Sequence, residues 1–148
     1  MKAVIQRVSR ASVTVDGKVA GSIGKGLLVL LGVEKDDTEK DLEIFAKKIP
    51  VYRIFNDEEG KMNLSLEDIS GSLLVVSQFT LFGTWRKGNR PGFTDAASPE
   101  KASRLYDLFI QRMKDRGIPA EKGVFGAMMK VDLTNEGPAT FVLDTKEG

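Results

Sequence analysis

An unbroken apolar segment at residues 27–33 constrains the fold more than any other part of the chain. A strand with one solvated face alternates apolar and polar residues, whereas a continuously apolar strand is covered on both faces. Residues 73–81 are predicted to form a second buried strand. The fold therefore needs a layer of secondary structure on each side of these strands.

Two segments carry the apolar periodicity of amphipathic helices. Residues 38–49 place apolar side chains at i, i+3, i+4 and i+7, and Pro50 ends this helix. The second helix begins with Ser98, a capping residue, followed by Pro99 at the first helical position. It is expected to end at Gly117.

The remaining elements are predicted to be short strands. Asp16-Gly17 is a two-residue hairpin signal between residues 12–15 and 18–23. Further strands are expected at residues 4–8, 51–55, 129–133 and 139–143. Two helices cannot cover both faces of so many strands, so we expect an α/β fold in a three-layer arrangement, with one helix layer on two β layers. Without a linker or repeat, residues 1–148 are predicted to be a single domain.

The chain has no histidine and no cysteine. Thiol nucleophiles, disulfides and zinc–thiolate sites are therefore excluded, and the commonest general base is missing. A Ser-His-Asp triad cannot be built. Any hydrolysis must use carboxylates, lysines, backbone dipoles or groups of the substrate, and we expect neither a metal ion nor another cofactor.

The formal net charge is +1, from 22 Lys and Arg residues against 21 Asp and Glu residues. Proteins that coat long nucleic acids are usually strongly basic, so an RNA ligand would be held at one end by a local basic patch. The longest apolar run, at residues 27–31, is too short to cross a bilayer. The first residues enter a strand pattern without a cleavable signal, so we expect a cytoplasmic protein that does not contact membranes.

Two segments far apart in the sequence carry a family resemblance: Ser77-Gln78-Phe79-Thr80-Leu81 and Asn135-Glu136-Gly137-Pro138-Ala139-Thr140. Connecting stretches at residues 88–91 and 123–128 match as well. With these segments the chain resembles the D-aminoacyl-tRNA deacylase family, from Met1 to about Thr145. The resemblance implies a homodimeric hydrolase, with its sites at the subunit interface, that releases free tRNA and a D-amino acid from D-aminoacyl-tRNA. It also implies the three-layer arrangement.

Gly137-Pro138 is predicted to lie at the tip of a hairpin, where it is an ordinary turn signal. The resemblance implies instead a Gly-cisPro motif, although few X–Pro bonds in proteins are cis. Its two carbonyl oxygens would hold the α-ammonium group of the substrate and exclude an L side chain, and the tip would enter the partner's site. Glu136 and Ala139 depart from the commonest form of the motif but only flank its core. Glycyl-tRNA would pass this gate, because glycine has no side chain.

Ser77, Gln78, Phe79 and Thr80 end the predicted strand at residues 73–81. They are either core residues or catalytic residues, since ligands often bind at the carboxyl ends of strands in α/β folds. The hydroxyl group of Thr80 is a weak nucleophile without a base. We therefore favour hydrolysis assisted by the 2′-hydroxyl group of the terminal ribose. Backbone N–H groups near Phe79 and Thr80 would stabilise the oxyanion, and the side chains of Gln78 and Thr80 would position the substrate.

Ala102 matches a small residue that in the family leaves room for the terminal adenosine, although it also fits a place in the helix core. Phe125 and Met129 fit either the hydrophobic core or the wall of an adenosine pocket. Arg7 matches an arginine that braces the Gly-Pro segment, and its alternative is an exposed strand residue. Residues 83–90 interleave basic side chains with Trp85, so they form either a solvated loop or a contact for the acceptor end of RNA.

Two other functions are compatible with the residues. A non-catalytic tRNA-binding module would need a partner chain, and a metal-dependent esterase would have to hold its metal with carboxylates alone. Incubating the protein with D- and L-aminoacyl-tRNA in chelator separates all three.

Overall fold

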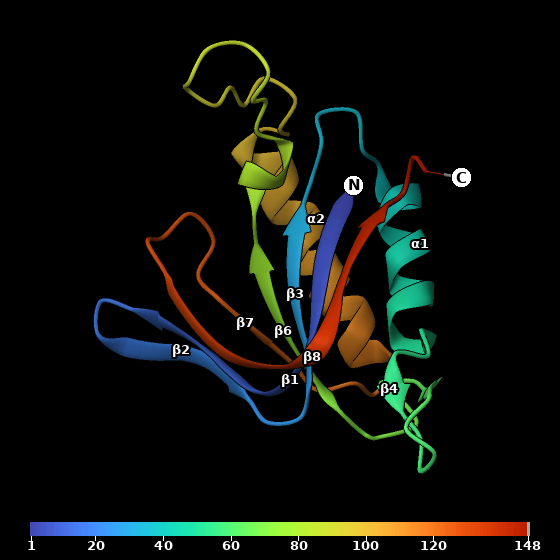
Figure 1. The fold of residues 1–148 in the computed structure, drawn as a ribbon. Coiled ribbons are helices and arrows are strands. Elements are labelled where there is room, and N and C mark those ends of the chain that lie inside the picture. The colour runs from blue at the N-terminus through green and yellow to red at the C-terminus, as the bar shows by residue number, and fades with distance from the viewer. Residues whose placement is uncertain (148) are drawn as a thin grey trace.

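A computed structural model of the chain describes residues 1–147 and contains a six-stranded mixed sheet with two helices (Figure 1). The sheet is built from strands β1 (Lys2–Val15), β2 (Lys18–Ile23), β3 (Gly26–Gly32), β6 (Ser72–Ser77), β7 (Ala120–Lys122) and β8 (Lys130–Asp144). The helices are α1 (Glu39–Lys48) and α2 (Pro99–Asp115). A separate small hairpin pairs β4 (Phe55–Asn56) with β5 (Met62–Leu64), and 3-10 helices cover Ile49–Val51 and Phe79–Phe82.

The sheet runs in the order β2-β1-β3-β6-β7, and β8 pairs with β1. Pairs of β1 with β2, β3 and β8 are antiparallel, whereas β3–β6 and β6–β7 are parallel. This mixture of strands and two helices agrees with the predicted α/β class. The strands belong to one hydrogen-bonded sheet, which bends strongly in Figure 1. The finer arrangement of one helix layer on two β layers stays a prediction.

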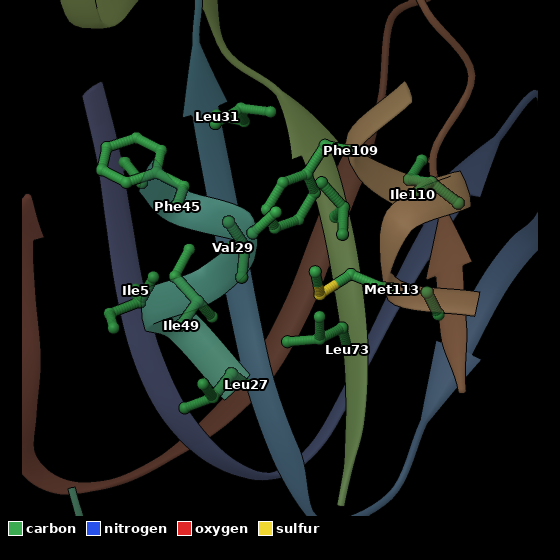
Figure 2. Packing of buried hydrophobic residues seen from close by; sticks show 14 of the residues in the cluster. Ile5, Leu27, Val29, Leu31, Phe45, Ile49, Leu73, Phe109, Ile110 and Met113 are labelled. Carbon is green, nitrogen blue, oxygen red and sulfur yellow. The ribbon is translucent and has the colours of Figure 1, made fainter. Parts of the chain in front are cut away.

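The apolar strand β3 is buried on both faces, as its sequence predicts. Leu27, Val29 and Leu31 face the helices and join the larger core cluster, shown in Figure 2. Leu28 joins a second cluster, which also contains Val13 of β1. Residues of α1 and α2 complete the larger cluster, so the helices cover one side of β3 and the bent part of the sheet lies on the other.

Both helices lie where they were predicted, and each begins after a capping side chain, although only the cap at Ser98 was predicted. Thr38 caps α1 by accepting a hydrogen bond from the backbone N of Lys40, and Asp41 completes a capping box. Ser98 caps α2 with Pro99 at its first position. No helix within residues 1–147 combines the length and the apolar character needed to span a bilayer.

The predicted breaks between the terminal strands are wrong. Residues 4–8 and 12–15 lie on one strand, β1, and residues 130–144 form one strand, β8. Both halves of β8 pair with β1: Val131 lies opposite Val13, and Phe141 lies opposite Ile5. Since both halves follow the same partner, β8 keeps its direction through Gly137-Pro138.

Gly137-Pro138 is therefore not at a hairpin tip. On β8, Asn135 pairs with Val8 and Thr140 pairs with Gln6, so residues 136–139 lie opposite Arg7 alone. The surplus residues form a bulge in a continuous strand.

Two other predicted strands end differently in the structure. Residues 51–55 contribute only Phe55 to a strand, because the chain first makes a 3-10 turn at Pro50. The strand at residues 73–81 stops at Ser77 and is followed by the 3-10 helix Phe79–Phe82.

The α-ammonium group of Met1 forms a buried ion pair with Asp37. Its nitrogen lies 2.7 Å from Asp37 Oδ1, and both side chains are fully buried. It also donates a hydrogen bond to Thr145 Oγ1 at 2.9 Å. Asp37 Oδ2 accepts from the backbone N of Glu34 at 2.6 Å. This cluster ties the start of β1 to the loop before α1.

We expect Asp37→Asn to lower the free energy of unfolding by about 3 kcal/mol, because the buried ammonium group loses its counter-charge. Urea denaturation measures the change. Asp36→Asn is the matched control, since Asp36 is exposed and should leave the unfolding midpoint unchanged. Equal midpoints for the two variants would contradict a stabilising role of the ion pair.

Candidate functional site

The first signature segment leaves the sheet at the carboxyl end of β6. The backbone N of Gln78 donates to the backbone O of Leu31 at 2.8 Å, which fixes the segment to the end of β3. The 3-10 helix then turns Phe79 and Thr80 outward, and both are exposed. The Gln78 side-chain amide donates to Thr80 Oγ1, so these two polar groups lie together at the surface.

The backbone hydrogen-bonding groups of this turn differ between its start and its end. Phe79 and Thr80 begin the 3-10 helix, so their N–H groups have no acceptor within it. The backbone O of Thr80 accepts from the backbone N of Gly83 at 3.0 Å. The turn therefore has two backbone donors without an acceptor in the 3-10 helix, beside the side chains of Gln78 and Thr80.

The second signature segment is the bulge of β8, where Gly137 and Pro138 are exposed and joined by a cis peptide bond. The Asn135 side-chain amide donates to the backbone O of Arg7 at 2.9 Å and to the backbone O of Ala139 at 3.2 Å. A Cβ atom on Gly137 would lie 2.5 Å from Asn135 Oδ1. A side chain at position 137 would therefore displace the Asn135 amide from the hydrogen bonds that hold the bulge.

Arg7 joins the bulge to the loop before β4. Its Nε donates to the backbone O of Glu136 at 2.8 Å. Its Nη1 donates to the backbone O of Ile54 at 2.9 Å and to Asn56 Oδ1 at 3.0 Å. Arg7 is thus multiply bonded rather than a free side chain on a strand, and it connects the backbone of Glu136, next to Gly137, to the loop before β4.

The three residues proposed for the adenosine pocket do not share one cluster. Ala102 is 8% exposed on α2 and belongs to the larger core. Phe125 packs on the same core, with its ring 6.1 Å from that of Tyr106, one helical turn after Ala102. Met129 packs on the second cluster instead. Ala102 and Phe125 can therefore line one surface, and Met129 approaches from the other side of the sheet.

Tyr106 lies close to these residues and carries a buried hydroxyl group. Its Oη donates to the backbone O of Val75 at 2.8 Å. Burial raises the pKa of the Tyr106 phenol well above its ordinary value, so the group stays neutral and holds α2 against β6.

The two signature segments lie far apart within one chain. Gln78 is beside Leu31 at one end of β3, whereas Arg7 pairs with Leu27 near the other end. The bulge and β6 are also separated by β1 and β3. Strand rise and strand spacing together place the segments on the order of 20 Å apart.

Two clefts formed by residues 1–147 lie near the two segments, and neither of the two is lined by both segments. A cleft of about 340 Å³ lies beside the bulge and is lined by Arg7, Val8, Ser9, Lys25, Phe55, Asn56 and Glu136. A larger one of about 580 Å³ lies beyond the first segment, beside Phe82 and Trp85. A site that uses both signatures therefore needs a second surface.

Two residues that hold these segments were not singled out from the sequence. Asn135 fixes the bulge, and a bulge signal was available because asparagine side chains often bond to nearby backbone groups. The Phe93 ring lies 5.1 Å from the Phe79 ring in an edge-to-face contact. This contact joins segments separated by a long loop, and no local pattern predicts it.

The sequence profile of the family described as D-Tyr-tRNA(Tyr) deacylase matches residues 4–144. A D-aminoacyl-tRNA deacylase of Geobacter sulfurreducens is 58% identical over 146 residues, covering 99% of this chain and 96% of that protein. The D-aminoacyl-tRNA deacylase of Thermosipho melanesiensis is 57% identical over 148 residues, covering 99% of each chain.

Two solved structures have similar folds. One, described as c-Myc DNA Unwinding Element Binding Protein, has a TM-score of 0.90 and 46% identity over 97% of this chain and 98% of that one. The other, a probable eukaryotic D-amino acid tRNA deacylase, has a TM-score of 0.81 over 96% and 97% of the two chains, and at 21% identity it shows the fold alone. From the profile match and the full-length relatives, the chain belongs to the D-Tyr-tRNA(Tyr) deacylase family.

Proposed function

We propose that this protein hydrolyses the ester bond of D-aminoacyl-tRNA and releases free tRNA and the D-amino acid. The observation that carries this proposal is the exposed turn at Gln78–Thr80, whose backbone N–H groups and polar side chains lie together at the end of two buried strands. The family and its full-length relatives support the same activity. The reaction would take place where aminoacyl-tRNA is used in translation, in the cytoplasm.

The turn offers no side chain that can act as a strong base. Its side chains are neutral, and the chain contains no histidine. In the proposed mechanism, the 2′-hydroxyl group of the terminal ribose assists the attack of water on the ester carbonyl. The N–H groups of Phe79 and Thr80 stabilise the negative charge on the carbonyl oxygen. Ser77, Gln78 and Thr80 position the substrate.

Chirality is read, in this proposal, by backbone atoms of the β8 bulge. The carbonyl oxygens of Gly137 and Pro138 accept hydrogen bonds from the α-ammonium group of the amino acid. An L side chain would then meet the backbone of the bulge, and no other pose keeps the ammonium group bonded. Arg7 and Asn135 support the gate by holding the backbone around it. Glycyl-tRNA passes the gate, because glycine carries no side chain.

The separation of the two segments leads us to propose a two-fold symmetric dimer. Each site combines the turn at Gln78–Thr80 of one subunit with the bulge of its partner. The surface near Ala102 and Phe125 receives the terminal adenosine, whereas Met129, which packs on the second cluster, does not line this surface of its own chain. A continuous strand holds the bulge at the edge of β1, so it cannot fold back across the sheet onto its own Thr80.

We expect rapid deacylation of D-aminoacyl-tRNA in excess chelator, and little reaction of the L-isomer. A substrate that ends in 2′-deoxyadenosine should react at least about 100-fold more slowly, since it lacks the assisting hydroxyl group. Thr80→Ala should slow the reaction only modestly, because Thr80 acts by positioning. Release of labelled amino acid measures all four rates.

Folding of the tRNA must be controlled when metal ions are removed, so each rate is compared with spontaneous hydrolysis in the same buffer. Equal rates on D- and L-substrates would exclude chiral proofreading. An unchanged rate on the 2′-deoxy substrate, or an aminoacyl group trapped on Thr80, would exclude the substrate-assisted mechanism.

The shared site predicts complementation between two inactive variants. Gly137→Ala should displace Asn135 and destroy the gate, whereas Ala102→Phe should fill the adenosine surface. A dimer that contains one subunit of each kind retains one intact site of two. We expect about half of the wild-type rate from such heterodimers, isolated with two affinity tags.

Thermal unfolding of each homodimer checks that the variants fold, because Ala102 lies in the core. If Ala102→Phe does not fold, Gln78→Ala, which alters the turn itself, replaces it as the second inactive variant. Heterodimers as inactive as the parent homodimers, under conditions where subunits exchange, would mean that each site lies within one subunit.

A further inference from the structure

Residues 85–91 form an exposed loop with a fixed base, which we call the basic finger. At its base, the backbone N of Thr84 donates to the backbone O of Gly92 at 2.8 Å, and the backbone N of Gly92 donates in return at 3.2 Å. Every residue of the finger is exposed. Figure 1 shows this yellow-green loop projecting beyond the ends of β3 and β6. The finger is thus a separate projection on a defined stem.

The finger carries three cations and no carboxylate: Arg86, Lys87 and Arg90. Among residues 1–147, none of the three forms an ion pair. Arginines of α2 differ in this respect, since Arg104 pairs with Glu39 and Arg112 pairs with Glu43. The finger therefore concentrates uncompensated positive charge in a protein whose formal net charge is only +1.

Trp85 arranges part of this charge. Its ring is 74% exposed, and the guanidinium carbon of Arg86 lies 4.9 Å from its centroid. A stacked guanidinium group keeps its N–H edge free for an anion, and this geometry suits bidentate contact with a phosphate. Folding alone does not account for so exposed an indole, which a ligand contact would explain.

The base of the finger contacts the turn that we assign to the ester. Gly83, which precedes the base, bonds to the backbone O of Thr80, and Phe93, which follows it, packs edge-to-face on Phe79. The direction of the finger relative to Thr80 is therefore fixed. Each of the two chain segments of the finger extends roughly 10 Å from the base. From a base that contacts the turn at Thr80, this length reaches past the reacting nucleotide to its neighbours.

The cleft of about 580 Å³ beside the finger is less suited to a phosphate. Trp85, Arg86 and Lys87 line part of it, and the rest of the lining mixes the carboxylates of Glu34, Asp95 and Asp144 with the cations of Lys2 and Lys146. Lys146 forms an ion pair with Glu34 there. Charge inside the cleft is thus partly compensated, whereas the exposed cations of the finger outside it have no carboxylate partner among residues 1–147.

We infer that the basic finger binds the phosphates of the nucleotides next to the esterified adenosine, at the 3′ end of tRNA. The inference rests on the proposed function, because it takes its direction from an ester held at Thr80. It assigns the finger to binding of the tRNA and not to the reaction. A contact limited to a few phosphates also explains how a nearly neutral protein can select an RNA substrate.

The test combines Arg86→Ala, Lys87→Ala and Arg90→Ala in one variant. With D-aminoacyl-tRNA, we expect its KM to rise about tenfold or more while kcat is retained. The slope of log(kcat/KM) against log[salt] should become shallower by about 2, as expected for three lost phosphate contacts on a single strand. With D-aminoacyl-adenosine, which has no phosphate, kcat/KM should equal that of the wild type.

A matched control replaces three exposed lysines far from the finger in sequence: Lys18→Ala, Lys40→Ala and Lys114→Ala. It removes the same charge and should leave the KM for tRNA near the wild-type value. Equal KM values for the two triple variants would overturn the inference. So would an equal loss on D-aminoacyl-adenosine, because the finger would then act through the fold of the turn.

Binding of nucleic acids that carry no aminoacyl group tests the finger independently of the reaction. The finger variant should lose affinity for tRNA relative to the control variant, and this difference should vanish when the 3′-terminal nucleotides of the tRNA are removed. A duplex DNA that loses the same affinity would indicate a general nucleic-acid surface and overturn the assignment to the 3′ end. If the wild type hydrolyses neither ester, the proposed function fails, and this comparison still decides the finger.

Discussion

Burial of β3 on both faces is the constraint on which the rest of the structure depends. Helices cover one face, so the bent sheet must supply the cover for the other. This cover requires β1 to be long enough to serve two parts of the sheet, and β1 pairs with three strands along its length. The two signature segments take their places from this arrangement: one follows the carboxyl end of β6, and the other lies opposite Arg7 on β1.

The proposed site is built largely from backbone groups. A chain without histidine or cysteine has few side chains for acid–base or nucleophilic chemistry, and the exposed turn accordingly offers amides and neutral polar groups. Backbone dipoles are rigid only when the backbone itself is held. Asn135 and Arg7 hold the bulge, while Leu31 and Phe93 hold the turn. Side chains in this protein position backbone groups, and the backbone would contact the substrate.

Much of the fold could be predicted from local sequence. The apolar run of β3, the hairpin at Asp16-Gly17 and the cap at Ser98 depend on neighbouring residues, and all agree with the structure. The continuity of β8 could not be predicted, because Gly-Pro is locally a turn signal. The strand pairing that overrides this signal joins residues from opposite ends of the chain, such as Val8 and Asn135. The early end of β6 likewise depends on the bond between Gln78 and Leu31 across the sheet.

Insertions and deletions should be tolerated very differently in the β8 bulge and in the basic finger. The β8 bulge is flanked on both sides by pairs with β1, so one residue more or fewer would shift a long strand by one register or break its hydrogen bonds. Thr84 and Gly92 pair at the base of the basic finger. The exposed residues of the finger beyond this pair contribute little to folding. Changes in the length of the finger should therefore have little effect on the stability of the folded protein. If variants with a longer or shorter finger fold normally but lose activity, the length of the finger is set by its ligand alone.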